Sequence, residues 1–284
     1  MRINKFIIGT AKFGMKYGFY KKETSLKQVE KILLYAKKSG INILDTALTY
    51  NNAFDKLVKV GIKDWSIISK IPSLPKEVKD IKAWVYKITF LTLEKLKISK
   101  IDTMLIHDEE NVINLKIGKK IFNSLEELKK NKLIKNIGCS IYDSYKIKKI
   151  INCYNFDLVQ CPFNILDTRI YSSGLAEILH KKNIKLHLRS IFLQGLLLKS
   201  NKLPKKFKNN KILQSFDKWL ANNNKNNINV CLSFVSKFNF DKLIVGVSNL
   251  KQFQEIIDRS KNLTNELPEF IIKNNNKLID PRKW

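Results

Sequence analysis

Four polar side chains of complementary chemistry follow three consecutive apolar runs of the sequence: Asp45, Tyr50, Lys70 and His107. A phenol with a pKa of about 10 is a poor proton donor at neutral pH, and a nearby ammonium group lowers that pKa by favouring the phenolate. A carboxylate fixes the position of the ammonium group, and an imidazole can hydrogen-bond a carbonyl oxygen beside the phenol. Together these groups predict the protonation of a carbonyl oxygen during hydride transfer.

Each of these residues also has an ordinary structural interpretation when it is taken alone. Asp45 can cap a helix, Lys70 can lie along the surface, and Tyr50 can pack in the core. His107 is one of three histidines and comes directly after an apolar run. The prediction of a catalytic site therefore depends on the fold bringing the four residues together.

The elements that must position these residues alternate regularly along the chain. Short apolar runs predict strands over residues 6–9, 42–46, 65–70, 102–107, 134–140, 157–161, 185–191 and 242–247. Longer amphipathic segments predict helices over residues 26–39, 53–60, 80–96, 118–130, 144–153, 173–182, 213–221 and 250–260. Ser25 and Gln28 have the spacing of a capping box at the start of the first helix. The strands are apolar throughout, which is typical of a parallel sheet buried on both faces.

A doubly wound sheet would satisfy this alternation, but eight regular units in 284 residues favour an α/β fold of the (β/α)₈ TIM barrel type, with one domain over residues 1–284. Barrel enzymes carry their active sites at the C-terminal ends of the strands, so the four residues are expected in one quadrant of the barrel mouth.

Two segments interrupt the regular alternation of strands and helices. Residues 199–211 are predicted to form a long basic loop, and the asparagine-rich residues 222–229 a surface connection.

The charge of the chain is unusual, with 53 basic and 25 acidic residues and a net charge of +28. Such a charge can attract nucleic acid or phosphorylated ligands. Only five of the basic residues are arginine, and the lysines are spread along the chain among many asparagines and isoleucines. This pattern favours a solvated lysine surface over a specific nucleic-acid site.

Other features of the sequence indicate where the protein is located and whether it binds a metal. The sequence has no run of about 18 apolar residues, so no membrane span is predicted, and the first residues lack the features of a signal peptide. A cytoplasmic protein is therefore expected. The four cysteines show neither C-x-x-C pairs nor zinc spacing. They are expected to be buried thiols, and no metal site is predicted.

An ordered series of motifs around the four residues resembles the aldo/keto reductase superfamily over almost the whole chain. The matching stretches are Ile8-Gly9-Thr10-Ala11 with Gly14 and Tyr17-Gly18, residues 40–47 with Tyr50, Ser69-Lys70, residues 102–107, Ile137-Gly138-Cys139-Ser140, Gln160-x-x-x-Asn164, Arg189-Ser190, Gln194-Gly195-Leu196 and Val245-Gly246-Val247-Ser248. A single stretch would be weak evidence. The complete series in this order and spacing is specific.

The resemblance implies a TIM barrel that binds a nicotinamide cofactor without a Rossmann fold. It implies a tetrad of Asp45, Tyr50, Lys70 and His107 in which Tyr50 is the general acid. It also implies cofactor contacts, which run from the nicotinamide to the adenosine end: Ser140, Gln160 and Asn164 at the carboxamide, Arg189 where many members stack an aromatic ring, Ser190 and Gly195 over the pyrophosphate, and Gly246, Ser248 and Gln252 at the 2′-phosphate.

Two departures from the family pattern concern the adenosine end of the cofactor. Gly246 stands where a basic residue is expected on the phosphate, and Ile256 stands where an asparagine often reads adenine. NADPH is the expected cofactor, and NADH stays open.

The sequence thus predicts an NAD(P)H-dependent aldo/keto reductase that converts an aldehyde or ketone to an alcohol. Pocket specificity in a barrel depends on its loops, which are expected here at residues 51–54, 109–114, 166–172 and 199–211, together with the C-terminal residues 281–284. Their few aromatic residues and their lysines and asparagines favour a polar or anionic carbonyl substrate, such as a sugar derivative. The alternative is a catalytically weak cofactor-sensing or interaction protein on the same barrel. Specific nucleic-acid binding is not predicted, because no zinc-finger or RNP-type motif is present.

Overall fold

Eight parallel strands close into a barrel in which each strand pairs with the next and the last pairs with the first. The computed structural model describes residues 1–16, 23–198, 205–269 and 276–284. The strands are β1 (Phe6–Gly9), β2 (Ile43–Asp45), β3 (Ser66–Ile71), β4 (Ile101–Ile106), β5 (Ile134–Ser140), β6 (Leu158–Pro162), β7 (Lys185–Arg189) and β8 (Lys242–Gly246). The predicted (β/α)₈ barrel is confirmed, and every predicted strand is present with small shifts at its ends.

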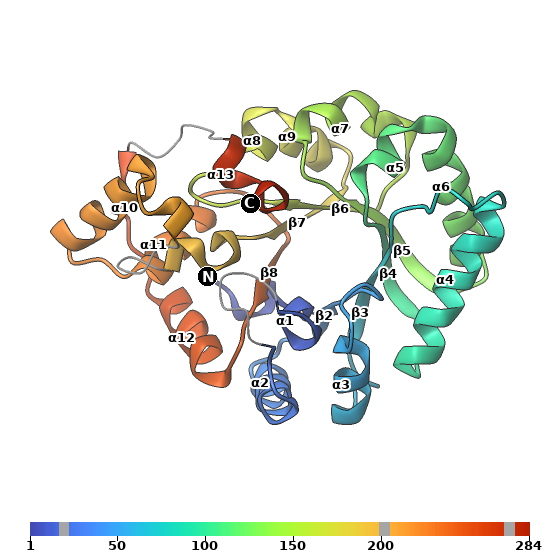
Figure 1. Ribbon diagram of the computed structural model, residues 1–284, viewed down its shortest axis with the longest axis horizontal. Coiled ribbons are helices and arrows are strands. Elements are labelled where there is room, and N and C mark those ends of the chain that lie inside the picture. The colour runs from blue at the N-terminus through green and yellow to red at the C-terminus, as the bar shows by residue number, and fades with distance from the viewer. Residues whose placement is uncertain (17–22, 199–204, 270–275) are drawn as a thin grey trace.

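Helices surround the barrel, as Figure 1 shows. They are α1 (Ala11–Gly14), α2 (Leu26–Lys38), α3 (Ala53–Val60), α4 (Ile81–Leu96), α5 (Glu109–Ile113), α6 (Leu115–Lys130), α7 (Ser144–Ile150), α8 (Arg169–Ser172), α9 (Leu175–Lys181), α10 (Lys211–Asn222), α11 (Asn227–Ser236), α12 (Leu250–Lys261) and α13 (Asn276–Ile279). All eight predicted helices are among them. The short helices α1, α5, α8 and α13 were not expected from the sequence.

The asparagine-rich segment differs from its prediction. Only the few residues between the end of α10 and the start of α11 form a connection, and Asn226 caps α11 by accepting a hydrogen bond from the Asn229 amide at 3.2 Å. Asparagine is a favoured N-cap, and the run after it is buried almost completely. A helix buried on nearly all sides lacks the amphipathic period, so the sequence pattern missed it.

The long basic loop is shorter than predicted. A 3₁₀ turn covers Lys205–Phe207, and Lys211 already belongs to α10. Residues 199–204 of the predicted loop lie outside the described residues.

Two smaller predictions also need correction. The side chain of Ser25 makes no capping hydrogen bond to α2, and the Gln28 side chain instead accepts one from the Leu250 amide at 3.0 Å. Gln28 therefore ties α2 to α12 instead of closing a capping box. Of the four cysteines, three are buried as expected, but Cys153 is exposed.

The barrel interior has an apolar floor with polar groups above it. Ile68 and Leu105 belong to a small buried cluster inside the barrel, and Ile43 packs against it. Side chains alternate between the two faces of a strand, so residues two positions apart point the same way. Asp45, Lys70 and His107 each follow one of these floor residues by two positions. The alternation of side chains along each strand therefore directs these polar groups into the barrel, above the floor and at one end of it.

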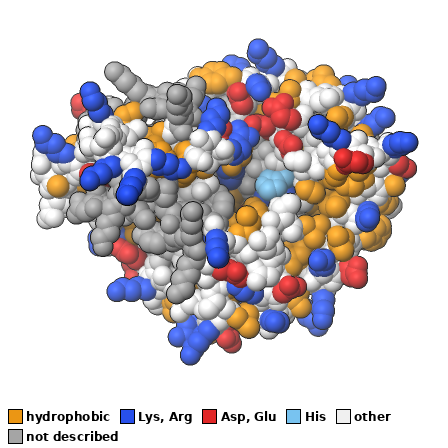
Figure 2. All heavy atoms as spheres, viewed as in Figure 1, with side chains coloured by type: hydrophobic (Ala, Val, Ile, Leu, Met, Phe, Trp, Pro, Cys, Tyr) orange, Lys and Arg blue, Asp and Glu red, His pale blue; other side chains and the backbone are white. Residues whose placement is uncertain are grey.

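The basic side chains on one face of the molecule do not gather into a single patch. On the face seen in Figure 2, Lys and Arg side chains are scattered among acidic and neutral ones. Within the described parts of the chain, no helix is both long and apolar enough to cross a membrane. The same residues contain no group of three or more His, Cys, Asp or Glu that could hold a metal ion.

Gly14 at the end of α1 allows a close approach to the loop that carries Tyr50. A Cβ atom on Gly14 would overlap the Tyr50 carbonyl oxygen and would lie 2.9 Å from the Ala53 Cβ. We expect Gly14→Ala to lower the free energy of unfolding by about 1–3 kcal/mol, because overpacking forces the backbone to move. Urea unfolding would measure this loss.

Gly246→Ala is the matched control for this change, since its new Cβ would meet only the Gly9 carbonyl oxygen at 3.8 Å. Equal stability of the two variants would show that the α1 contact has no energetic importance.

Candidate active site

A buried ion pair forms the base of the site. Lys70 Nζ lies 2.7 Å from Asp45 Oδ1 and donates a second hydrogen bond to the Thr46 carbonyl oxygen at 2.8 Å. The other Asp45 oxygen accepts a hydrogen bond from Gln160 Nε2 at 2.8 Å. Lys70 is 1% exposed and Asp45 4%, so solvent does not screen this pair. The pair itself joins β2 to β3, and it is held in place by Thr46, directly after β2, and by Gln160 of β6.

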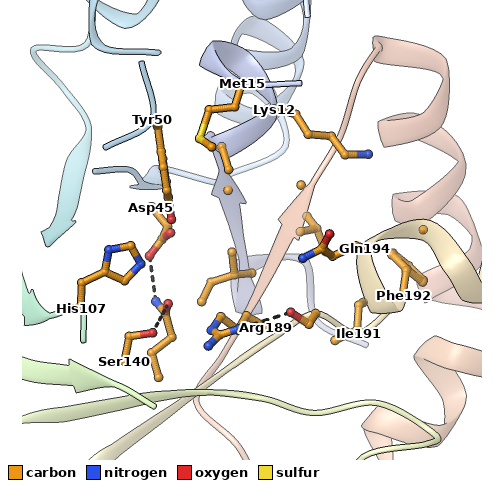
Figure 3. Close-up of a pocket in the computed structure, with 18 of the residues that line it drawn as sticks. Lys12, Met15, Asp45, Tyr50, His107, Ser140, Arg189, Ile191, Phe192 and Gln194 are labelled. Atoms are coloured by element: carbon orange, nitrogen blue, oxygen red, sulfur yellow. Dashed lines mark hydrogen bonds between the residues drawn. The ribbon is translucent and has the colours of Figure 1, made fainter. Parts of the chain in front are cut away.

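Tyr50 and His107 lie above this pair. Their ring centroids are 6.2 Å apart, and the rings are nearly perpendicular at 79°. Lys70 Nζ lies 5.1 Å from the centroid of the Tyr50 ring. Asp45, Tyr50 and His107 line one cavity of about 340 Å³, and Figure 3 shows all three on the same side of it. The structure thus brings together the four residues that the sequence singled out.

Burial raises the pKa of Tyr50 well above its ordinary value, and the Asp45 carboxylate raises it further. Arg189 is the cation that acts in the opposite direction. The expected lowering of the Tyr50 pKa is therefore wrong for this state of the protein, because burial and the Asp45 carboxylate outweigh the effect of the nearby cation. Burial also lowers the pKa of Lys70 itself, against the opposing effect of Asp45. Tyr50 is consequently a neutral phenol that holds a proton.

His107 is also neutral. Burial lowers its pKa to about 3, and the positive charges of Lys70 and Arg189 contribute to the shift. A neutral imidazole keeps one N–H donor and one acceptor, so it can hydrogen-bond an oxygen without carrying a charge.

The low pKa of His107 predicts how stability depends on pH. In the unfolded chain, His107 binds a proton below its ordinary pKa of 6.5. In the folded protein, the same imidazole stays unprotonated until the pH falls to about 3. The free energy of unfolding should therefore decrease as the pH falls from 6.5 towards 3. Urea unfolding at several pH values should show a smaller decrease for His107→Gln. Titration near neutral pH of the His107 imidazole NMR signal, identified by its absence from the spectrum of His107→Gln, would contradict this prediction.

Ser140 and Gln160 line the cavity beside the tetrad. The Ser140 hydroxyl lies 3.5 Å from Gln160 Oε1, while the Gln160 amide nitrogen is bonded to Asp45. Asn164 is placed differently: it is fully buried, donates to the Ser190 carbonyl oxygen at 3.2 Å and accepts from the Leu166 amide at 2.9 Å. Asn164 thus supports the loop after β7.

Arg189 enters the cavity from the end of β7. It donates to the Ile141 carbonyl oxygen at 3.1 Å and to the Ser190 hydroxyl at 3.4 Å. Its guanidinium carbon lies 4.1 Å from the centroid of the Tyr142 ring. Arg282 lies 3.8 Å from the centroid of the same ring. A tyrosine ring with two arginines stacked on it therefore borders the tetrad.

The C-terminal segment contributes to this border. Arg282 forms ion pairs with the buried Glu109 at 3.0 Å and with Asp280 at 2.9 Å. Glu109 also accepts hydrogen bonds from the backbone amides of Tyr142 and Asp143, both at 2.7 Å. The sequence predicts that residues 109–114 and the C-terminal tail through Arg282 shape the pocket, but it indicates neither Tyr142 nor the contacts among these residues, since no local motif marks them.

The far side of the cavity is built from the loops after β7 and β8. Ser190, Gln194 and Gly195 have positive φ values of 61°, 55° and 92°, so the backbone turns sharply there. Ser190, Gly195, Gly246 and Gln252 all line the cavity. Ser248 is held next to it, because its amide donates to Gln252 Oε1 at 3.0 Å.

These residues fit an elongated anionic ligand. Arg189 brings a positive charge to the tetrad end of the cavity and Lys12 brings one to the other end (Figure 3). Gly246 has open space where a side chain would project. Lys12 is a residue that the sequence analysis missed, since it belongs to a short helix far from the expected phosphate contacts. A dinucleotide with its phosphates along the cavity suits this distribution of charge.

A closed (β/α)₈ barrel with polar groups above its floor, at the C-terminal ends of its strands, has the architecture of a TIM-barrel enzyme. The sequence matches the Aldo/keto reductase family over residues 5–267. The chain therefore belongs to the aldo/keto reductase family, whose members are generally oxidoreductases.

Solved structures agree with this fold. The aldo-keto reductase AKR11C1 from Bacillus halodurans, in its holo form, is 18% identical with a TM-score of 0.72, and 95% of each chain is covered. A proposed aldo-keto reductase from Pseudomonas aeruginosa is 18% identical with a TM-score of 0.67, and 90% of this chain and 88% of that chain are covered. No curated protein matches the sequence.

Proposed function

We propose that this protein reduces an aldehyde or ketone to an alcohol with a nicotinamide cofactor, with Tyr50 as the proton donor. The observation that carries the proposal is the buried Asp45–Lys70 pair beneath a neutral Tyr50 and a neutral His107, on one side of a single cavity.

The four residues have separate roles in this mechanism. When it is bound, the cofactor supplies the hydride to the carbonyl carbon. Tyr50 donates its hydroxyl proton to the carbonyl oxygen, and the neutral imidazole of His107 hydrogen-bonds the same oxygen and orients it. The Lys70 ammonium stabilises the negative charge that develops on Tyr50 as the proton leaves. Asp45 holds Lys70 in place and is itself held by Gln160, and solvent returns a proton to Tyr50 after the alcohol departs.

NADPH is the proposed cofactor. Ser140 and Gln160 would hold its carboxamide end, with Arg189 beside the ring. Ser190 and Gly195 would lie along its pyrophosphate, and Asn164 would act indirectly by fixing Ser190. Gly246, Ser248 and Gln252 would border its adenosine phosphate. The open backbone at Gly246 and the positive charges at both ends of the cavity support this assignment.

A polar or anionic carbonyl compound, such as a sugar derivative, is the proposed substrate class. The arrangement of Arg189, Tyr142 and Arg282 supports it, since a guanidinium group beside the tetrad favours carboxylate, phosphate or hydroxyl groups over a purely apolar body.

A panel of carbonyl compounds tests both parts of the proposal. The loss of NADPH absorbance would be followed with matched pairs of substrates, in which one member carries a carboxylate or hydroxyl groups and the other is apolar. We expect turnover, with higher kcat/KM for the polar members. A preference for the apolar members would overturn the substrate class. NADPH binding without turnover of any member would favour the cofactor-sensing alternative.

A further inference from the structure

Lys12 is a buried cation in the same cavity but on the opposite side from Tyr50 and His107. It is 6% exposed and belongs to α1, directly after β1. Its Nζ lies 3.3 Å from the Ser248 hydroxyl, so the side chain reaches the loop after β8. Figure 3 shows it directed away from Tyr50, towards the β8 side of the cavity. A residue near the start of the chain therefore places a positive charge beside the loop that follows β8, the last strand.

The surface that Lys12 meets is built for a polar group. Gln252 fixes the Ser248 amide at 3.0 Å, which holds the Ser248 hydroxyl beside the lysine. Gly246 is exposed and contributes no side chain, and a Cβ there would meet only the Gly9 carbonyl oxygen at 3.8 Å. This end of the cavity thus offers open space, a hydroxyl group and a cation for a ligand. The cation comes from α1 and not from position 246, where the family pattern has a basic residue.

We propose that Lys12 binds the adenosine 2′-phosphate and makes the protein select NADPH over NADH, in place of the basic residue that Gly246 lacks. This inference rests on the proposed function, because it assumes that the cavity holds a nicotinamide dinucleotide. A phosphomonoester carries about two negative charges at neutral pH, and its oxygens accept charge-assisted hydrogen bonds from ammonium groups. NADH has only a hydroxyl group at this position, so it would gain little from the lysine.

The burial of Lys12 strengthens this argument. Burial lowers the pKa of Lys12, so the lysine gains more from an anion than a fully hydrated surface lysine would. Screening by salt is also weak for a buried charge. The pyrophosphate is the competing position for Lys12, but NADPH and NADH share it. A lysine that bound the pyrophosphate would strengthen the binding of NADPH and of NADH equally.

The test measures binding of ligands without turnover. Lys12→Met removes the charge, and dissociation constants for NADPH, NADH, adenosine 2′,5′-bisphosphate and AMP are measured by calorimetry. We expect NADPH and the bisphosphate to bind about 10- to 100-fold more weakly, which is the size of a charge-assisted hydrogen bond. NADH and AMP should change by less than about twofold. Lys27→Met, which removes an exposed lysine of α2 outside the cavity, should leave all four constants unchanged.

Moving the charge provides a rescue experiment. Gly246 lines the cavity and a Cβ there would make only one ordinary contact, so we expect Gly246→Lys in the Lys12→Met background to restore most of the preference for NADPH. Lys12→Gln gives a second neutral variant if Lys12→Met does not fold, as judged by circular dichroism. It should show the same selective loss.

Two results would overturn the inference. Equal losses for NADPH and NADH would assign Lys12 to the pyrophosphate, and unchanged constants for both would leave it with only a structural role. Failure of the proposed function has a different signature. If no carbonyl compound is turned over but NADPH binding still depends selectively on Lys12, the reductase proposal falls and the cofactor assignment stands.

Discussion

Replacing Tyr50 with phenylalanine should lower kcat for carbonyl reduction by about 10²- to 10⁴-fold, which is the usual contribution of one acid–base group. Tyr50 is the phenol beside Lys70 and His107, and its raised pKa keeps it protonated before the reaction. Phenylalanine has the same ring but no proton to donate. The barrier should therefore rise at the proton-transfer step, while the packing of the loop is kept.

The measurement is steady-state NADPH oxidation with the best substrate of the panel, together with the dissociation constant of NADPH. That constant should stay within about twofold of the wild type, because the hydroxyl group acts on the carbonyl oxygen in the transition state. Tyr86→Phe is the matched control. Tyr86 belongs to α4, and its hydroxyl group donates to Glu127 of α6 at 2.9 Å, outside the cavity, so its removal should not change kcat. A Tyr50→Phe variant as fast as the wild type would refute the proposed acid.

The fold could be predicted from the sequence because each strand–helix unit has its own local signal. Continuous apolar strands and amphipathic helices such as α2 and α12 follow directly from the burial of one or both faces. The helix α11 could not be found in this way, since its buried run has no polar face. Its N-cap Asn226 belongs to the asparagine-rich tract, whose composition predicts a surface connection.

The residues of the site can likewise be separated into those that a local pattern predicts and those that it does not. Asp45, Lys70 and His107 were predictable because each is a polar residue at or directly after the C-terminal end of an apolar strand. Lys12 and Arg282 were not, because their contacts join segments far apart in the chain: Lys12 with Ser248, and Arg282 with Glu109. A spacing rule within one strand cannot report such contacts. The abundance of lysine also concealed Lys12 among many surface residues of the same type.

The net charge of the chain can now be related to individual residues. Most lysines are exposed, and pairs such as Lys37–Asp64 at 2.7 Å contribute little because water and salt screen them. Lys70 and Lys12 are different, since both are almost fully buried. One lies at the tetrad and the other at the opposite side of the cavity. The electrostatics of the site therefore depend on burial and position rather than on the total charge.

The second large effect should come from Lys70→Met, which should lower the free energy of unfolding by about 3–5 kcal/mol and also abolish most activity. Methionine nearly fills the volume of the lysine but carries no charge. Asp45 would keep its hydrogen bond from Gln160 and lose its only ion-pair partner among the described residues, while remaining buried. Activity should fall because the developing phenolate on Tyr50 would lose the nearby ammonium, while the Asp45 carboxylate would still oppose its negative charge. Urea unfolding at neutral pH, followed by tryptophan fluorescence, measures the first effect.

The double variant Asp45→Asn/Lys70→Met separates stability from catalysis. Removing both charges leaves no unpaired buried ion, so most of the lost stability should return, whereas activity should not. Lys37→Met is the control for removing a lysine from an ion pair. Its pair with Asp64 is exposed, with side-chain exposures of 55% and 75%, and its loss should cost less than about 1 kcal/mol. If Lys70→Met cost no more than Lys37→Met, Asp45 would have to be hydrated or protonated in the folded protein. The buried pair would then no longer explain how Tyr50 loses its proton.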